Sequence, residues 1–243
     1  VTRPAFVGAD AGGLALTVAV GSSGAASVSF GAAVAINDVA NIITASITNS
    51  RTPGIVAGGT VDVLAVSAAT VNVLTVGIAG AVAAGSGVSF SFAAAGSGSG
   101  NDIANTVTAE VSNSVIDAEG DVTVKASDAS TIHADAGAGA FSVAGGASGG
   151  VSGAFGAGIA QSFIANVVNA HVHNSVISTA ANKAQQVLVR AESISLIDAV
   201  AATAVLAVGA AGDAGVSLAV AGSFVENIII NAVEARVDGG TSI

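Results

Sequence analysis

The chain has 243 residues, of which 52% are hydrophobic, 3% are aromatic and 9% are charged, and its 16 acidic and 6 basic side chains give a formal net charge of −10. So apolar a composition excludes intrinsic disorder, which requires low hydrophobicity and high charge. The absence of cysteine excludes disulfides, thiolate metal sites and thiol catalysis, and the few, scattered basic residues argue against nucleic acid as a partner.

Strand-forming segments of two kinds alternate along the chain. The first kind is apolar or small at nearly every position and occupies residues 14–20, 73–84, 136–143 and 199–211. The second kind alternates apolar and polar residues and occupies residues 43–47, 107–111, 168–172 and 233–237. This alternation predicts one buried and one solvated face. β-Branched residues and glycine fill both kinds, which disfavours helix, and Asn-Ser, Gly-Gly and Glu-Gly-Asp turns separate the strands.

The first kind of strand presents few polar side chains to water, which is typical of strands buried on both faces. The favoured interpretation is an interior of alanine and glycine within one chain, and the alternative is a packing surface for another subunit. None of these runs reaches the roughly 20 uninterrupted apolar residues that a spanning helix needs, so no transmembrane segment is predicted. No signal-peptide pattern follows Val1, so any export signal is expected outside these residues.

Internal repetition is the strongest feature of the sequence. A segment of the form Asn-x-[Val/Ile]-x-Ala-x-[Val/Ile] begins at positions 41, 105, 166 and 231. Val-Ser pairs at positions 28, 88, 151 and 216 follow the same period of about 63 residues. The chain is therefore predicted to be one array over residues 1–243, with approximate repeats 1–58, 59–120, 121–183 and 184–243. Such an array leaves no room for a separate catalytic domain.

One repeat carries a longer pattern, Asn-x-x-Thr-Ala-x-Val-x-Asn-Ser-x-Ile-x-Ala-x-Gly-Asp-Val-x-Val-x-Ala, in residues 105–126. With the Gly/Ala/Ser/Val-rich stretch that follows it, this pattern resembles the β-strand repeats of very large secreted bacterial surface proteins, including filamentous-haemagglutinin-like adhesins and leukotoxin-like repeat proteins. The resemblance covers nearly the whole chain. It implies an all-β fold, a parallel β-solenoid of about four repeats, and an extracellular or cell-surface location.

The number of coils in each repeat follows from which strands pair directly. A repeat of about 63 residues exceeds the 20–50 of common repeat units, so each repeat is either one flattened coil or two coils. In a single-coil solenoid, Ser46, Glu110, His171 and Arg236 would lie in one column on directly paired strands about 4.8 Å apart. In a two-coil unit another strand would lie between them.

The alternative fold is a long-stranded antiparallel meander. Residues 75–92 can also form a hairpin around Gly85-Ser86-Gly87, and one hairpin in each repeat would produce the same periodicity. In that fold the strand between two repeats would run antiparallel to both.

A histidine pair is the first candidate site. His171 and His173 are two residues apart, so on a strand both rings point to the same polar side. Such a pair can ligate zinc or copper, but two imidazoles are fewer than the usual three or four ligands. Solvated surface is the favoured interpretation, and no metal-ligating residue is predicted.

Acidic residues at expected turns form the second candidate. Their oxygens could bind calcium, but Asn and Asp favour turns for backbone reasons alone, and no calcium-binding nonapeptide array is present. Calcium is therefore the single cofactor considered, and none is predicted. The residues concerned are Asn37-Asp38, Asn101-Asp102, Asp117, Glu119 and Asp121.

Three further patterns resemble catalytic or phosphate-binding motifs but lack other parts that those motifs require. Residues 146–150 match Gly-x-Ser-x-Gly around Ser148 but lack the strand-to-helix elbow of a nucleophile. Residues 96–100 form a Gly-Ser-Gly-Ser-Gly tract without the lysine of a phosphate loop and are expected to be a flexible turn. Glu110 and Glu234 lie on solvated strands but in different columns and without aromatic residues that would hold a sugar. No catalytic or cofactor-binding residue is predicted, and the chain is not expected to be an enzyme.

The remaining segment of note contains Lys183 and Gln185-Gln186, which are predicted to lie in a loop insertion where the repeats differ. The leading functional hypothesis is a structural repeat segment of a secreted or cell-surface bacterial fibre, stalk or adhesin that self-associates into filaments. The alternative is a ligand-binding adhesin or toxin region that recognises host glycan or protein, although the low aromatic content argues against it.

Overall fold

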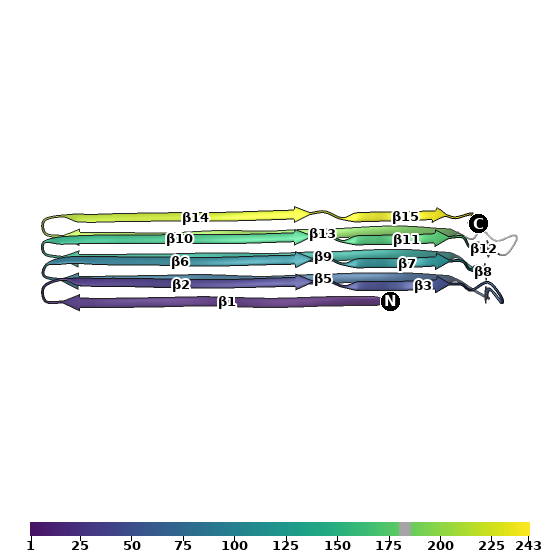
Figure 1. Ribbon diagram of the computed structural model, residues 1–243, viewed down its shortest axis with the longest axis horizontal. Coiled ribbons are helices and arrows are strands. Elements are labelled where there is room, and N and C mark those ends of the chain that lie inside the picture. Colours follow the sequence, from purple (N-terminus) through teal and green to yellow (C-terminus); the bar gives the residue numbers. More distant parts are fainter. Residues whose placement is uncertain (180–185) are drawn as a thin grey trace.

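The computed structural model describes residues 1–179 and 186–243, which form strands and turns without any helix (Figure 1). The long strands are β1 (Thr2–Gly21), β5 (Val61–Gly85), β9 (Val122–Gly146) and β13 (Val187–Ala211). Each is followed by one of the second strands, β2 (Ala25–Val39), β6 (Val88–Ile103), β10 (Gly149–Ile164) and β14 (Gly215–Ile229). Seven-residue strands come next: β3 (Ile42–Thr48), β7 (Thr106–Ser112), β11 (Val167–His173) and β15 (Ala232–Asp238). Short strands β4 (Ile55–Ala57), β8 (Val115–Ala118) and β12 (Val176–Thr179) complete the coils.

The fold is a parallel β-solenoid in which each repeat is one coil. Strands of each class stack in chain order into their own parallel sheet, β1-β5-β9-β13, β2-β6-β10-β14, β3-β7-β11-β15 and β4-β8-β12. Glu110 on β7 pairs directly with His171 on β11, and His171 pairs with Arg236 on β15. This pairing confirms the predicted parallel β-solenoid, shows that each repeat is one coil, and excludes both the two-coil unit and the meander.

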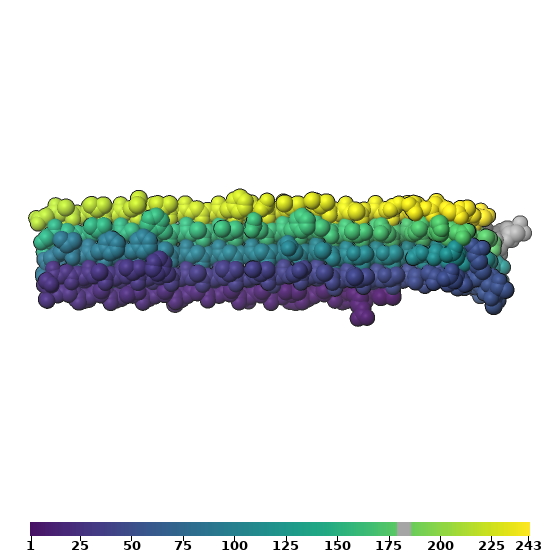
Figure 2. Space-filling view, viewed as in Figure 1, coloured from purple at the N-terminus to yellow at the C-terminus, as the bar shows by residue number. Residues whose placement is uncertain are grey.

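The segment Gly85-Ser86-Gly87 connects two layers instead of forming a hairpin. β5 and β6 on either side of it belong to different sheets, and the two strands pack face to face. The apolar alternation that permits a hairpin serves equally well here, because the inward side chains of both strands are buried between the layers. Figure 2 shows the result as parallel bands, with the N-terminal coil along one long edge and the C-terminal coil along the other.

The turns that follow the seven-residue strands lie at the other end of the coil from Gly85-Ser86-Gly87. They use the asparagine and glycine residues that the sequence indicated. Asn49, Asn113 and Asn174 adopt positive φ of 57°, 48° and 45°, and Gly239 takes the equivalent place with φ of 68°. Asparagine tolerates this left-handed conformation better than most residues, and glycine does so without strain. Each turn therefore redirects the chain at the same position of every coil.

The core lies between the two layers. It becomes thinner from the seven-residue strands towards the turns that join the long strands to the second strands. Near the seven-residue strands it consists of valine and isoleucine, including the fully buried Val107, Val124 and Val168. Towards the turns that join the long strands to the second strands it consists mainly of alanine, such as Ala79, Ala93 and Ala140. The abundance of small residues is thus explained by two sheets that approach closely.

Inward-facing glycines mark the closest approach of the layers. A Cβ at Gly77 would overlap the carbonyl oxygen of Gly96, and a Cβ at Gly31 would overlap that of Ile78. Outward-facing residues of the long strands are exposed, as Leu14 (78%) and Leu206 (58%) show. The expectation that these strands are buried on both faces therefore holds within the chain for the inward face only.

Gly77 and Gly139 provide a matched test of this packing. Gly77→Ala should lower the free energy of unfolding by about 1–3 kcal/mol, because the added methyl group would push the two layers apart. Gly139→Ala should be neutral within about 0.5 kcal/mol, because no heavy atom lies within 4 Å of the place that its Cβ would take. Denaturant unfolding of both variants measures the difference, and equal losses would contradict the assignment of inward and outward faces.

Candidate functional site

The polar face of the sheet β3-β7-β11-β15 carries two of the three histidines and several charged side chains of the repeats. Parallel pairing in register creates three columns on this face because the apolar residues between them point into the core. The columns are Thr44, Thr108, Asn169 and Glu234; Ser46, Glu110, His171 and Arg236; and Thr48, Ser112, His173 and Asp238.

His171, His173 and Asp238 converge at the end of these columns. Asp238 Oδ1 lies 3.1 Å from His171 Nε2 and 2.6 Å from His173 Nδ1. The other carboxylate oxygen, Oδ2, forms an ion pair with Arg236 Nε at 2.6 Å. The three side chains are only partly exposed, 27% for His171, 43% for His173 and 32% for Asp238. We refer to them as the His-Asp cluster.

The charge of Asp238 is set by its neighbours. Hydrogen bonds from His173 and then His171 lower the pKa of this carboxyl to about 2, and the Arg236 guanidinium adds to the effect. Asp238 is therefore an ionised carboxylate at neutral pH, held in one orientation from both sides.

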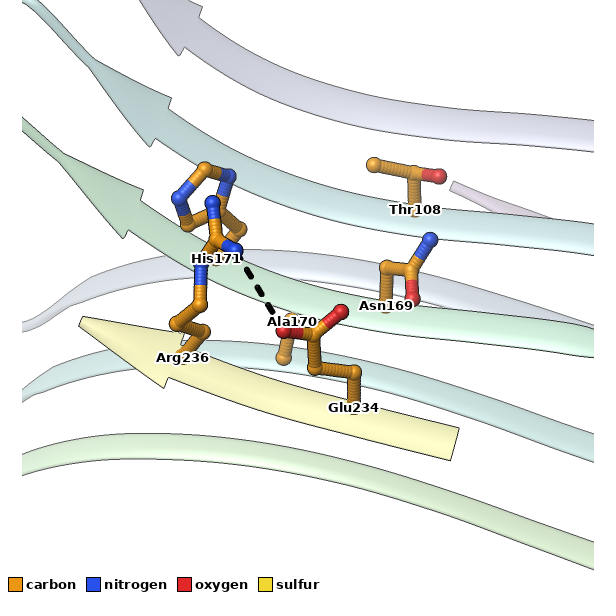
Figure 3. A pocket seen from close by; sticks show the side chains of 6 residues that line it. All are labelled: Thr108, Asn169, Ala170, His171, Glu234 and Arg236. Carbon is orange, nitrogen blue, oxygen red and sulfur yellow. Dashed lines mark ion pairs between the residues drawn. The ribbon is translucent and has the colours of Figure 1, made fainter. Parts of the chain in front are cut away.

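A depression of about 150 Å³ lies beside the His-Asp cluster (Figure 3). Its lining consists of Thr108, Asn169, Ala170, His171, Glu234 and Arg236. Arg236 Nη1 lies 3.6 Å from Glu234 Oε1, so the depression carries both signs of charge (Figure 3). It is small and shallow compared with ordinary ligand pockets of roughly 300–1,000 Å³.

A second polar cluster, which the sequence did not indicate, lies in the interior at the bend between the second and the seven-residue strands. Asp128, only 1% exposed, accepts hydrogen bonds from Asn105 Nδ2 at 3.1 Å and from Asn166 Nδ2 at 2.6 Å. Ser130 Oγ donates a further bond at 2.8 Å. The carboxylate is thus satisfied by donors within the core, which identifies the cluster as structural.

The asparagines of this interior cluster also link successive coils. The side-chain Oδ1 of Asn105 accepts the backbone N–H of Asn41 at 3.2 Å, that of Asn166 accepts the N–H of Asn105 at 2.9 Å, and that of Asn231 accepts the N–H of Asn166 at 3.0 Å. We call this series the asparagine ladder. Its members are the asparagines that begin the sequence repeat. The recurrence of asparagine at this one position is the signal from which the asparagine ladder could have been predicted.

Apolar side chains cover much of the two broad outer faces. On the long-strand sheet, Leu14, Ile78 and Leu206 are 78%, 40% and 58% exposed. On the opposite sheet, the rings of Phe30, Phe92 and Phe155 follow one another with centroid distances of 5.9 and 5.3 Å.

The acidic residues considered for calcium were expected at turns, but Asp38, Asp102 and Asp117 lie within β2, β6 and β8. Across residues 1–179 and 186–243, the His-Asp cluster is the one group of three or more His, Cys, Asp or Glu side chains with ligand atoms close enough to hold a metal ion. Asn37 and Asn101 instead bond to each other, from Nδ2 to Oδ1 at 2.8 Å, and Asp121 Oδ1 accepts the backbone N–H of Gln186 at 2.9 Å.

The remaining sequence candidates lie apart from one another. Ser148 occupies the turn between β9 and β10, where its backbone N–H donates to Gly87. Residues 96–100 are not a flexible turn as predicted but part of β6, because Ser97 (6% exposed) and Ser99 (4%) point inward while the glycines between them point outward. Glu110 and Glu234 lie on β7 and β15, with β11 between them. Lys183 and Gln185 lie outside the described residues.

Comparisons with known proteins give no further assignment. No family model, no curated protein and no solved structure matches the chain. In the part of the chain that the structure describes, no helix is long and apolar enough to cross a membrane.

The interior cluster predicts a large effect for one asparagine. Asn166→Ala should lower the free energy of unfolding by about 2–4 kcal/mol, because it removes a donor to the buried Asp128 and the acceptor for the Asn105 N–H. Asn72→Ala, at an exposed position of β5, is the control and should change it by less than about 0.5 kcal/mol. Denaturant titration measures both, and a neutral Asn166→Ala would mean that the asparagine ladder does not stabilise the bend.

The lowered pKa of Asp238 predicts an acid-sensitive contribution to stability. The ionised Asp238 carboxylate stabilises the folded state fully above the ordinary carboxyl pKa of about 3.9. This contribution to folding stability is lost as pH falls through the folded-state pKa of about 2. The difference in unfolding midpoint between wild type and Asp238→Asn should therefore be largest at pH 5 and should shrink as pH falls to 2. Asp62→Asn, outside the cluster, provides the control, and a difference that persists unchanged at pH 2 would contradict the prediction.

Proposed function

We propose that the chain is a structural segment that stacks end to end with other copies of itself into a β-ribbon. The observation that supports this proposal is the exposed core of the coil formed by β13, β14 and β15, which within residues 1–243 is covered by another coil on one side only. Ile103 and Ile164 are fully buried, whereas Ile229, the next residue of the same interior column, is 46% exposed. In the same way, Val111 and Val172 are fully buried while Val237 is 44% exposed. A further coil stacked here would bury these side chains.

The asparagine ladder supports a second copy as the occupant. At one end of the stack, the backbone N–H of Asn231 points to the place where the next coil would present an asparagine Oδ1. At the other end, no coil within the described residues donates a backbone N–H to Asn41 Oδ1. The two ends are therefore complementary to each other, so that Asn41 of a second copy would continue the pattern of bonds at 2.9–3.2 Å.

The geometry of such a contact favours open-ended growth. β1 and β13 are the outer strands of their sheet, and exposed edges of parallel sheets offer unpaired backbone donors and acceptors for another strand. A contact between two different ends does not close on itself when the copies are related by translation, and it produces a filament. Added copies would extend the stack at right angles to the strands.

The biological setting of this proposal follows from the resemblance of residues 105–126 to bacterial surface repeats. We assign the segment to a secreted or cell-surface fibre, stalk or adhesin, as a scaffold without a catalytic role. Its support is an array of coils whose chemistry is mostly backbone pairing and small-residue packing. The competing function, recognition of host glycan or protein by the outer faces, is distinguished by the experiment below.

Electron microscopy of the purified chain tests the assembly. We expect ribbons of uniform width of roughly 80–90 Å, because the longest strands have 25 residues at about 3.3 Å each. Val225→Lys should abolish the ribbons, since Val225 (40% exposed) extends an interior column in which Ala160 is fully buried. Val220→Lys, on the same strand with 47% exposure, points outward and should preserve them.

Three outcomes would contradict the proposal. The first is that the wild-type chain remains a 22.7 kDa monomer at all accessible concentrations. The second is that the two lysine variants behave alike, and the third is that the ribbons vary in width. Monomers that bind a host glycan or protein would favour the adhesin function instead.

A further inference from the structure

We propose that the His-Asp cluster binds one divalent transition-metal ion of the zinc type across the third and fourth coils. Its ligands would be His171 Nε2, His173 Nδ1 and Asp238 Oδ1, which all lie within 4.8 Å of one another. Two imidazole nitrogens with one carboxylate oxygen form a donor set that zinc accepts when a fourth position is left open. This inference concerns the polar face and is independent of how copies of the chain assemble.

The distances in the cluster suit a shared ion. In a tetrahedral zinc site with bonds of about 2.0–2.2 Å, ligand atoms lie roughly 3.0–3.6 Å apart. Asp238 Oδ1 already lies 3.1 Å from His171 Nε2 and 2.6 Å from His173 Nδ1, so small side-chain rotations would open the site. The ion would take the place of these hydrogen bonds, and each neutral ring would carry its proton on the nitrogen that faces away from the ion.

The backbone of Asp238 is firmly held, which favours a preformed site. Its carbonyl oxygen accepts hydrogen bonds from the Asn174 N–H at 3.1 Å, from the Thr241 N–H at 3.3 Å and from Thr241 Oγ1 at 2.6 Å. On the side chain, Arg236 Nε occupies Oδ2 and leaves Oδ1 facing the imidazoles. Ligands fixed in this way lose little freedom when an ion binds.

Charge around the cluster favours a cation despite the presence of Arg236. The guanidinium is opposed by Glu234, whose Oε1 lies 3.6 Å from Arg236 Nη1. Glu110 is paired with His171 in the adjacent strand, and the chain as a whole carries a net charge of −10. The carboxylates near the site therefore outnumber the one guanidinium.

The fourth repeat departs from the others at the position where the site needs space. The first three turns carry asparagine at positive φ, as at Asn174, whereas the fourth carries Gly239. A Cβ at residue 239 would overlap the imidazole ring of His173. Glycine at this position thus makes room for the ring beside Asp238, which ties the change in the repeat to the His-Asp cluster.

A bound ion would brace the exposed end of the stack. His171 and His173 belong to β11, and Asp238 belongs to β15. The ion would thus join the third coil to the fourth, whose core is open. Its remaining coordination position would face solvent, because the ligand side chains are 27–43% exposed, and water or a donor from another molecule would fill it.

Zinc titration of the full-length chain, followed by calorimetry and thermal unfolding near pH 7.5, tests the site. We expect one ion bound per chain and a melting temperature that rises with zinc concentration. His173→Ala and Asp238→Asn should each weaken binding at least tenfold. His133→Ala is the matched control, because His133 forms a single pair with Asp198 at 3.7 Å and should leave binding unchanged.

Gly239→Asn separates the site from general stability. It restores the residue of the other three turns, which accommodates positive φ, so the melting temperature without zinc should stay close to that of wild type. Zinc affinity should fall because the new side chain displaces the His173 ring. Absence of zinc binding in the millimolar range, or an equal loss of affinity in His133→Ala, would overturn the proposal, and so would full affinity in Gly239→Asn.

Discussion

Direct pairing of every coil with the next, in a single register, is the constraint on which the rest of the structure depends. The asparagine ladder sets this register at the bend, since the Oδ1 of Asn105, Asn166 and Asn231 each accepts one backbone N–H from the coil before. A slip of one residue would break these bonds and would turn every core side chain outward. The buried Asp128 strengthens the same point because it receives donors from two coils, Asn105 and Asn166.

The thin interior follows from this stacking and determines what the outside can do. Where the layers approach most closely, Gly31 and Gly77 have backbone of the facing sheet directly beneath them, and no room remains for a cavity or a buried catalytic group at those positions. Chemistry is therefore confined to the outward columns and to the two ends. In a stack of this kind each coil packs mainly against its neighbours, so an outward column can change from one coil to the next without disturbing the core. The His-Asp cluster arises from such differences, with imidazoles in one coil and a carboxylate in the next.

Most of the architecture could be read from the sequence, and the failures have physical causes. Strand identity, the repeat period and the turns at Asn49 and Asn113 follow from local patterns that side-chain alternation and left-handed backbone impose. The chain path at Gly85-Ser86-Gly87 could not be decided locally, because a hairpin and a connection between layers require the same alternation and the same flexible turn. Residues 96–100 were misjudged as a turn because a Gly-Ser alternation looks flexible, although its serines point inward and its glycines outward on β6.

The sequence by itself determined that the chain is an all-β array of four units, because alternation and periodicity are properties of neighbouring residues and of equal spacing. It also determined which residues share a column once one repeat equals one coil. Only the tertiary structure decided that equality, since the pairing of strands 61–65 residues apart depends on long-range backbone hydrogen bonds. The same pairing brings Asp238 to His173 across 65 residues of chain. No local pattern reveals that these side chains meet, because their convergence depends on the rotamers and on the turn at Gly239 that the folded coils impose.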